Sequence, residues 1–202
     1  MKSAMKIDTK EKVMALYEMA NDTEDFISLM QTAFIYHTPK LLEGCDTKAD
    51  EYKKGAAHLS EIIPAFIADD PDLKPYVSVP AHLLRMWENL DKLSELIDKK
   101  IKENILFSDK AVDETIYLFQ RLVEILRPTA DMVLARNTFL SKYILTSQSD
   151  VEKMAAEYAT LHKNRLVRGE CMPVSSSLYV SMLEAIKSIA WHAKEIAVKL
   201  SS

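Results

Sequence analysis

The side chains best suited to chemistry in this 202-residue sequence are five histidines and two cysteines. The histidines, which can bind a metal ion or transfer a proton, are His37, His58, His82, His162 and His192. None stands in the Glu-x-x-His spacing of carboxylate-bridged di-iron bundles or in His-Glu-x-x-His. His37 lies on an apolar stripe and His192 follows Trp191 on another, so we expect structural roles for both imidazoles.

The sequence contains no motif that is typical of nucleophilic catalysis or of nucleotide binding. Cys45 and Cys171 are too few for a disulfide framework or a cysteine-rich zinc site, and we expect two reduced thiols. The sequence contains no Gly-x-x-x-x-Gly-Lys-Ser/Thr, no Gly-x-Gly-x-x-Gly and no Gly-x-Ser-x-Gly. Ser175, Ser176 and Ser177 are expected to cap a helix. The sequence therefore predicts a protein that is not an enzyme.

Composition and charge further restrict the class of protein that this sequence can encode. Apolar residues make up 48% of the chain and charged residues 28%, which is typical of a folded globular protein. Three glycines are too few for the many tight reversals of an all-β fold, and a net charge of −4 argues against binding nucleic acid. No stretch approaches the ~18 consecutive apolar residues of a membrane span, and the N-terminus lacks the apolar core of a signal peptide. We expect a cytoplasmic protein that does not span the membrane.

Apolar residues recur at helical spacing almost from end to end. This periodicity predicts six helices, at about 9–43, 47–68, 80–105, 108–144, 150–168 and 177–200. Asp8 and Glu11 fit the N-terminal cap of the first helix, and Ser149 and Glu152 fit a capping box at the start of the fifth. The stretch 69–80, rich in proline and aspartate, is the clearest loop.

The order of a long helix followed by two medium ones is predicted to occur twice. Segments starting near 8 and 108 are 100 residues apart, and Lys10/Lys110 and Tyr17/Tyr117 coincide at that offset. The sequence thus predicts an all-α fold of two tandem three-helix repeats, 8–105 and 107–202, that share one elongated core.

The last forty residues resemble the closing segment of PhoU-type domains, which occur in phosphate-transport regulators and on the cytoplasmic side of sodium–phosphate cotransporters. The first part of that family's pattern, His-x-x-Arg-Leu-x-x-Gly, is matched by His162, Arg165, Leu166 and Gly169. The second part is matched by Ile189, His192, Ala193, Ile196 and Ala197. The segments 46–59 and 82–97 are similar to the second and third helices of a PhoU repeat.

This resemblance implies a six-helix PhoU-like bundle and a regulatory or accessory role in phosphate transport. The implied mechanism is contact with a membrane phosphate transporter or an associated signalling protein, by a homodimer that reaches the inner face of the membrane through that partner. We expect the loops 69–80 and 169–177 to lie together at one end of the bundle and to form the contact surface.

The family pattern also implies acidic side chains at four-residue spacing that bind metal ions in clusters. Carboxylates at positions i and i+4 of a helix lie side by side and can chelate a hard cation or iron. In the first repeat Asp46, Asp50 and Glu88 stand at positions of this pattern, but the position four residues after Glu88 is Lys92, and Asp91 lies one step from it. Together Asp46, Asp50, Glu88 and Asp91 could hold a divalent metal or iron. The alternative is that acids near a helix N-terminus serve only the helix dipole and solvent.

The second repeat departs from the pattern at its acidic positions. The Glu and Asp expected in the sixth helix are Lys187 and Trp191, and an earlier Asp is Ser181. Lysine adds positive charge and tryptophan offers no ligand, so we expect that this repeat has lost its metal site. Two hypotheses remain: a module that acts by contact and needs no cofactor, or a carboxylate metalloprotein with one site in the first repeat.

Overall fold

The computed structural model describes residues 2–201, and their side chains from position 9 onward. Within this range the chain forms six α-helices, two short 3₁₀-helices and no strand, so the predicted all-α class is confirmed. The α-helices are α1 (Lys2–Tyr36), α2 (Cys45–Phe66), α3 (Val79–Lys102), α4 (Asp109–Ala135), α5 (Thr138–Val167) and α6 (Pro173–Leu200). The 3₁₀-helices are η1 (Pro39–Leu42) and η2 (Pro71–Tyr76). None of the helices in this range has the length and hydrophobicity needed to cross a lipid bilayer.

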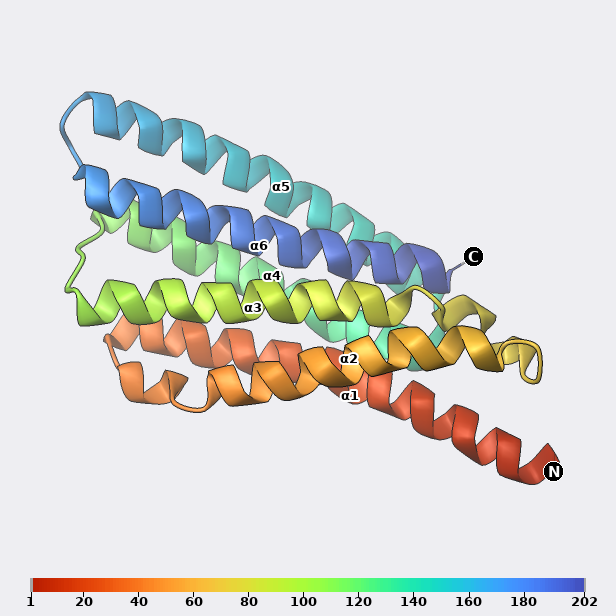
Figure 1. Cartoon of the computed structure of the whole chain (residues 1–202). Coiled ribbons are helices and arrows are strands. Elements are labelled where there is room, and N and C mark those ends of the chain that lie inside the picture. The colour runs from red at the N-terminus through yellow and green to blue at the C-terminus, as the bar shows by residue number, and fades with distance from the viewer. Residues whose placement is uncertain (1, 202) are drawn as a thin grey trace.

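The six helices form one elongated bundle (Figure 1). Helix α2 packs on α3, and α5 packs on α6, while α4 packs on both α5 and α6. The most extensive packing, however, joins the first three helices to the last three, through α1 on α4 and α3 on α6. The connection 103–108 separates the two triplets along the chain. Their interpretation as two repeats, 8–105 and 107–202, stays a prediction.

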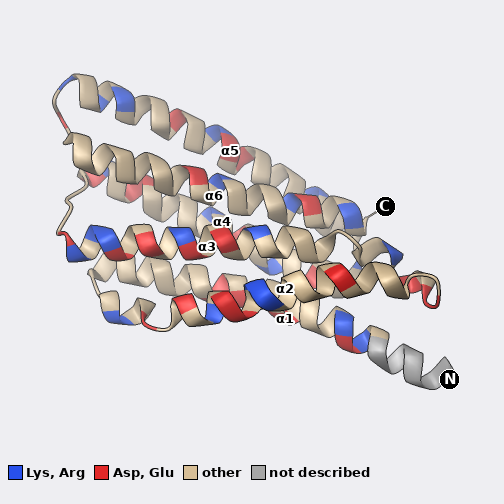
Figure 2. Ribbon diagram, viewed as in Figure 1, with Lys and Arg blue, Asp and Glu red and all other residues tan. Residues whose placement is uncertain are grey.

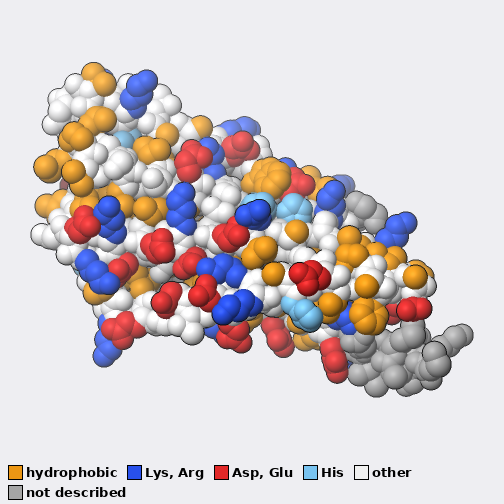
Figure 3. Space-filling view, in the orientation of Figure 1, with side chains coloured by type: hydrophobic (Ala, Val, Ile, Leu, Met, Phe, Trp, Pro, Cys, Tyr) orange, Lys and Arg blue, Asp and Glu red, His pale blue; other side chains and the backbone are white. Residues whose placement is uncertain are grey.

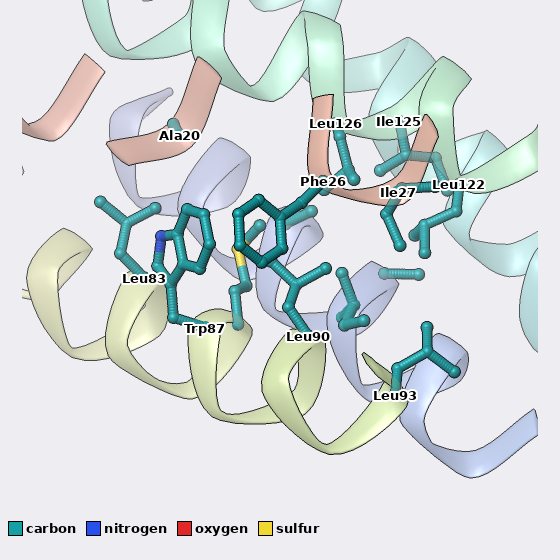
Figure 4. Packing of buried hydrophobic residues seen from close by; sticks show 14 of the residues in the cluster. Ala20, Phe26, Ile27, Leu83, Trp87, Leu90, Leu93, Leu122, Ile125 and Leu126 are labelled. Atoms are coloured by element: carbon teal, nitrogen blue, oxygen red, sulfur yellow. The ribbon is translucent and has the colours of Figure 1, made fainter. Parts of the chain in front are cut away.

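A single apolar core runs through this junction between the triplets. Figure 4 shows side chains of α1, α3 and α4 pointing toward one another, with Trp87 of α3 beside Phe26 of α1. The two rings meet edge to face with centroids 4.8 Å apart, a favourable geometry for aromatic pairs. The indole is fully buried, and its Nε1–H donates a hydrogen bond of 3.1 Å to the carbonyl oxygen of Met19. Trp87 therefore anchors α3 to α1 through both packing and a hydrogen bond.

The first helix differs from the prediction at both ends. It begins at Lys2 rather than near 9, so its backbone passes through position 8 without starting there. The side chain of Asp8, the predicted cap, lies outside the described residues. The helix ends at Tyr36 instead of 43, because Pro39 disfavours helical geometry in the residue before it and begins η1. His37 is consequently an exposed residue with a φ of 52°, not the core imidazole that the sequence predicts.

The boundary between the fourth and fifth helices was also predicted wrongly. The chain breaks at Arg136, which has a φ of 47°, and at Asn137, whose side chain accepts a hydrogen bond of 2.8 Å from the backbone N–H of Phe139. Ser149 and Glu152 therefore lie inside α5 and cap nothing. Helices α4, α5 and α6 have 27, 30 and 28 residues, so the long–medium–medium order does not occur twice.

The loops 69–80 and 169–177 lie at opposite ends of the bundle, contrary to expectation (Figure 1). Helices α3 and α6 are antiparallel neighbours: His82 at the start of α3 meets His192 near the end of α6. At the other end, Ile105 just after α3 lines the same hollow as Val174 at the start of α6. Because each loop precedes one of these two helices, antiparallel packing sends the loops to opposite ends.

Replacing Trp87 with alanine should lower the free energy of unfolding by about 3–5 kcal/mol, because it leaves a large cavity where the triplets meet. Trp191→Ala is the control: that indole is 42% exposed, so its loss should cost clearly less than the loss of Trp87. Urea unfolding followed by circular dichroism measures both values. Equal stability of the two variants would contradict this role of Trp87.

Candidate functional site

The acidic residues singled out in the sequence lie on α2 and α3, where red and blue segments alternate in Figure 2. Asp46 and Asp91 line one side of a hollow of about 500 Å³ between η1, α2 and α3. The other charged residues around this acidic hollow are Glu43, Glu95, Asp98 and Lys102. Space-filling atoms in Figure 3 show acidic and basic side chains interspersed along the middle of this face.

A lysine stands between two of the predicted metal ligands. The Nζ of Lys53 lies 2.7 Å from an oxygen of Asp50 on its own helix and 2.6 Å from Oδ2 of Asp91 on α3. Hydrogen bonds to Asp50 and then to Asp91 raise the pKa of the Lys53 ammonium, and the hydrogen bond from Lys53 lowers the pKa of Asp50. The ammonium therefore occupies the space between the two carboxylates that a cation would need and offsets part of their charge.

The other two predicted ligands have separate partners. Glu88 accepts a hydrogen bond of 2.7 Å from Arg85, one turn earlier on α3. Asp46 accepts one of 2.8 Å from the backbone N–H of Thr47 in the first turn of α2, where its charge favours the helix dipole. Between positions 9 and 201, no three His, Cys, Asp or Glu side chains are grouped as a metal ion requires. In this arrangement the four carboxylates do not fit a metal ion.

The corresponding face of the second triplet carries a second, smaller hollow, lined by Gln148, Glu152, Glu184, Lys187, Ser188 and Trp191. Here Lys187 donates hydrogen bonds of 2.9 and 3.1 Å to the two oxygens of Glu184. Lys153 and Glu157, at the positions where the family pattern expects acids in the fifth helix, are both exposed on α5. A lysine paired with a carboxylate thus occurs at both faces.

A buried polar network in the second triplet was not predicted as a unit. Arg165 of α5 donates two hydrogen bonds, of 2.8 and 2.6 Å, to the carboxylate of Glu114 of α4. Tyr179 of α6 donates a third, of 2.5 Å, to the same carboxylate. Burial and the hydrogen bond to Glu114 raise the pKa of the Tyr179 hydroxyl, which stays protonated as a donor. This carboxylate therefore ties three helices together.

His162, next to this network, has the environment of a structural residue. It is buried, and its Nε2 lies 2.9 Å from the hydroxyl of Ser176 at the start of α6. Burial first, and the positive charge of Arg165 second, lower the pKa of its imidazole. The sequence pointed to two members of the network, because His162 and Arg165 both match the family pattern. Their partners Glu114 and Ser176 could not be paired with them before α4, α5 and α6 were placed.

Comparison with known proteins shows which solved structures have the same fold. No protein-family model matches the sequence, and no curated protein matches it. Among solved structures, the chain is similar to PhoU from Pseudomonas aeruginosa, with a TM-score of 0.82 and 14% identity over 99% of this chain and 97% of that one. It is also similar to the phosphate transport system regulatory protein PhoU from Streptococcus pneumoniae, with a TM-score of 0.75 and 9% identity over 97% and 94% of the two chains. The chain therefore has a divergent PhoU-like fold, as the resemblance of its last forty residues implied.

Replacing Glu114 with alanine should destabilise the protein by about 2–4 kcal/mol, because it leaves the largely buried Arg165 without its counter-charge and Tyr179 without its acceptor. The control is Glu184→Ala, which removes an exposed ion pair with Lys187 and should cost less than about 1 kcal/mol. Chemical unfolding of both variants gives the comparison. A loss below 1 kcal/mol for Glu114→Ala would show that the network does not hold α4, α5 and α6 together.

Proposed function

We propose that this chain is a non-enzymatic regulatory or accessory protein linked to phosphate transport. It would act by contact with a membrane phosphate transporter or an associated signalling protein. The observation that carries the proposal is the PhoU-like fold, which extends over 99% of the chain and includes both helix triplets. We further propose that it works in the cytoplasm as a homodimer, reaching the inner face of the membrane through its partner.

The geometry around the most reactive side chains supports a role without catalysis. The Sγ of Cys171 lies 4.0 Å from Nε2 of His162, at the long end of the range for a hydrogen bond from sulfur, and it lies 3.9 Å from the Ser176 hydroxyl as well. Ser176 is closer to His162, but it is buried in the first turn of α6 and donates a hydrogen bond of 3.1 Å to the carbonyl oxygen of Met172. The predicted capping role of Ser175, Ser176 and Ser177 is wrong: the N-cap of α6 is Met172, and the three hydroxyls donate to backbone carbonyl oxygens one turn earlier.

A contact surface is available where the α3–α4 and α5–α6 connections lie. Val167, Met172, Leu106 and Val174 are exposed there by 80, 69, 67 and 59%. We call these four residues the apolar end; Figure 3 shows orange side chains gathered at this extremity of the molecule. Exposed apolar side chains that gather in one place are typical of protein–protein interfaces. Only one of the two loops proposed from the sequence, 169–177, contributes to this end.

Charges placed on the apolar end should weaken partner binding at least about tenfold, because a carboxylate there would be desolvated in the interface. The test is a pull-down from native lysate with the Val167→Asp/Met172→Asp double variant and with wild type. Phe139→Asp is the control, since that ring is 79% exposed at the start of α5, at the opposite end of the helix.

The captured proteins are identified by mass spectrometry. Recovery of a phosphate-transport component by wild type and by Phe139→Asp, and its loss in the double variant, supports the proposal. Wild-type protein that captures no such component contradicts it, whereas equal capture by all three proteins contradicts only the role of the apolar end. Light scattering during gel filtration tests the homodimer separately.

The carboxylate metalloprotein is the second hypothesis, and it is less well supported because Lys53 already bridges Asp50 and Asp91. What favours it is that Asp46 and Asp91 share the acidic hollow. Elemental analysis of protein purified without chelator should find the same metal content in wild type and in Asp46→Asn/Asp91→Asn. About one metal per chain, lost in Asp46→Asn/Asp91→Asn and retained in the exposed-site control Glu157→Gln, would instead support this hypothesis.

A further inference from the structure

Two histidines that no functional pattern connects meet where the triplets pack together. His82 of α3 and His192 of α6 are 110 positions apart, yet their Nδ1 atoms are 3.1 Å from each other. The two rings are tilted by 50°, with centroids 5.4 Å apart. Both side chains are half-buried, so the pair lies at the edge of the core with one side open to solvent.

The separation of the two nitrogens suits a shared metal ion. Imidazole nitrogens bind transition metals at about 2.0–2.1 Å, so two of them at an angle of about 90–110° lie roughly 2.9–3.4 Å apart. The observed 3.1 Å falls within that range, and rotation of the two rings would direct both lone pairs at one ion. Without metal, the same distance suits an Nδ1–H···Nδ1 hydrogen bond, in which one ring donates its proton to the other.

The surroundings keep these nitrogens available as ligands. Burial lowers the pKa of both imidazoles, that of His192 to about 4, so both are neutral at pH 7 and carry a lone pair. Glu195 and Glu88 are the nearby acids, and Arg85 and Lys199 are the nearby bases. Within residues 9–201 no third ligating side chain is grouped with the pair, so water completes the coordination.

We propose that His82 and His192 form a two-histidine site for a divalent transition-metal ion such as Cu²⁺, Ni²⁺ or Zn²⁺. Imidazole pairs select these ions, whereas Mg²⁺ and Ca²⁺ prefer oxygen ligands. On binding, the donor imidazole moves its proton from Nδ1 to Nε2, so that both Nδ1 lone pairs face the metal and no net proton is released from the two neutral rings. The site uses none of the acidic residues Asp46, Asp50, Glu88 or Asp91.

A bound ion would clamp α3 to α6 and so join the first triplet to the second. Because only the folded chain brings His82 and His192 together, the ion stabilises the folded state by mass action. At about a hundredfold excess of free ion over the dissociation constant, the melting temperature should rise by about 5–10 °C.

Trp191 provides a reporter beside the site. Its ring meets that of His192 edge to face with centroids 4.7 Å apart, and the ring of His82 is 6.0 Å away. The only other tryptophan, Trp87, is fully buried. Titration of the full-length, untagged protein with Ni²⁺ or Cu²⁺ should therefore quench the Trp191 emission in a saturable way at one ion per chain. Trp191→Phe should abolish the optical signal and keep the heat of binding in calorimetry.

The decisive variants are His82→Gln and His192→Gln, each of which should lower Ni²⁺ affinity at least about tenfold and abolish the rise in melting temperature. His58→Gln is the matched control, since His58 is exposed on α2 and lies outside the site. An excess of Mg²⁺ should not compete with Ni²⁺. Circular dichroism confirms that each variant is folded.

A measurement on wild type avoids dependence on the variants. The electron paramagnetic resonance spectrum of the 1:1 Cu²⁺ complex should show coupling to two imidazole nitrogens. No saturable binding up to about 100 μM ion, a spectrum with oxygen ligands only, or glutamine variants that bind as tightly as His58→Gln would each overturn the proposal. None of these outcomes depends on the proposed role in phosphate transport.

Discussion

The structure depends on the burial of α1 and α3 of the first triplet against α4 and α6 of the second. Helix α1 has little contact with α2, so most of its apolar face is covered by α4. Helix α3 lies between α2 and α6 and carries Trp87, Leu90 and Leu93 into the common core. Since each triplet alone would expose these faces to water, neither has a complete core of its own. The same antiparallel packing of α3 on α6 places the loops at opposite ends and brings His82 to His192.

The second triplet adds a polar constraint to this apolar one. The Glu114 carboxylate holds Arg165 and Tyr179, and His162 lies beside them against Ser176. These residues stand within a few positions of Val167, Met172 and Val174 along α5 and α6. The Glu114 carboxylate accepts three hydrogen bonds and resists rearrangement, because any movement would leave its charge unpaired in a medium of low dielectric. The network thus fixes the apolar end, which is the surface we propose for partner contact.

The charged faces explain why contact is a better-supported function than metal binding at the carboxylates. Lys53 donates to Asp50 and Asp91, and Lys187 donates to Glu184, so on each face a lysine occupies carboxylates that a cation would need. An ammonium group satisfies neighbouring carboxylates with one charge and flexible geometry, whereas a divalent ion requires several oxygen atoms arranged around one point. The two histidines differ in this respect, because they are uncharged, already adjacent and suited to softer ions.

The sequence by itself determined the all-α class, the number of helices, the approximate bounds of α2, α3 and α6, and the likeness to PhoU. Those features can be predicted because they depend on local sequence: the spacing of apolar residues, the positions of prolines and a short C-terminal pattern. The break between α4 and α5 escaped prediction because apolar residues continue at helical spacing across Arg136 and Asn137, and the single capping residue Asn137 was the only sign. Only the tertiary structure decided that Lys53 pairs with Asp91, that Glu114 meets Arg165 and that His82 meets His192. These partners are 38, 51 and 110 positions apart, and which helix faces which is set by how the whole bundle buries its apolar surface.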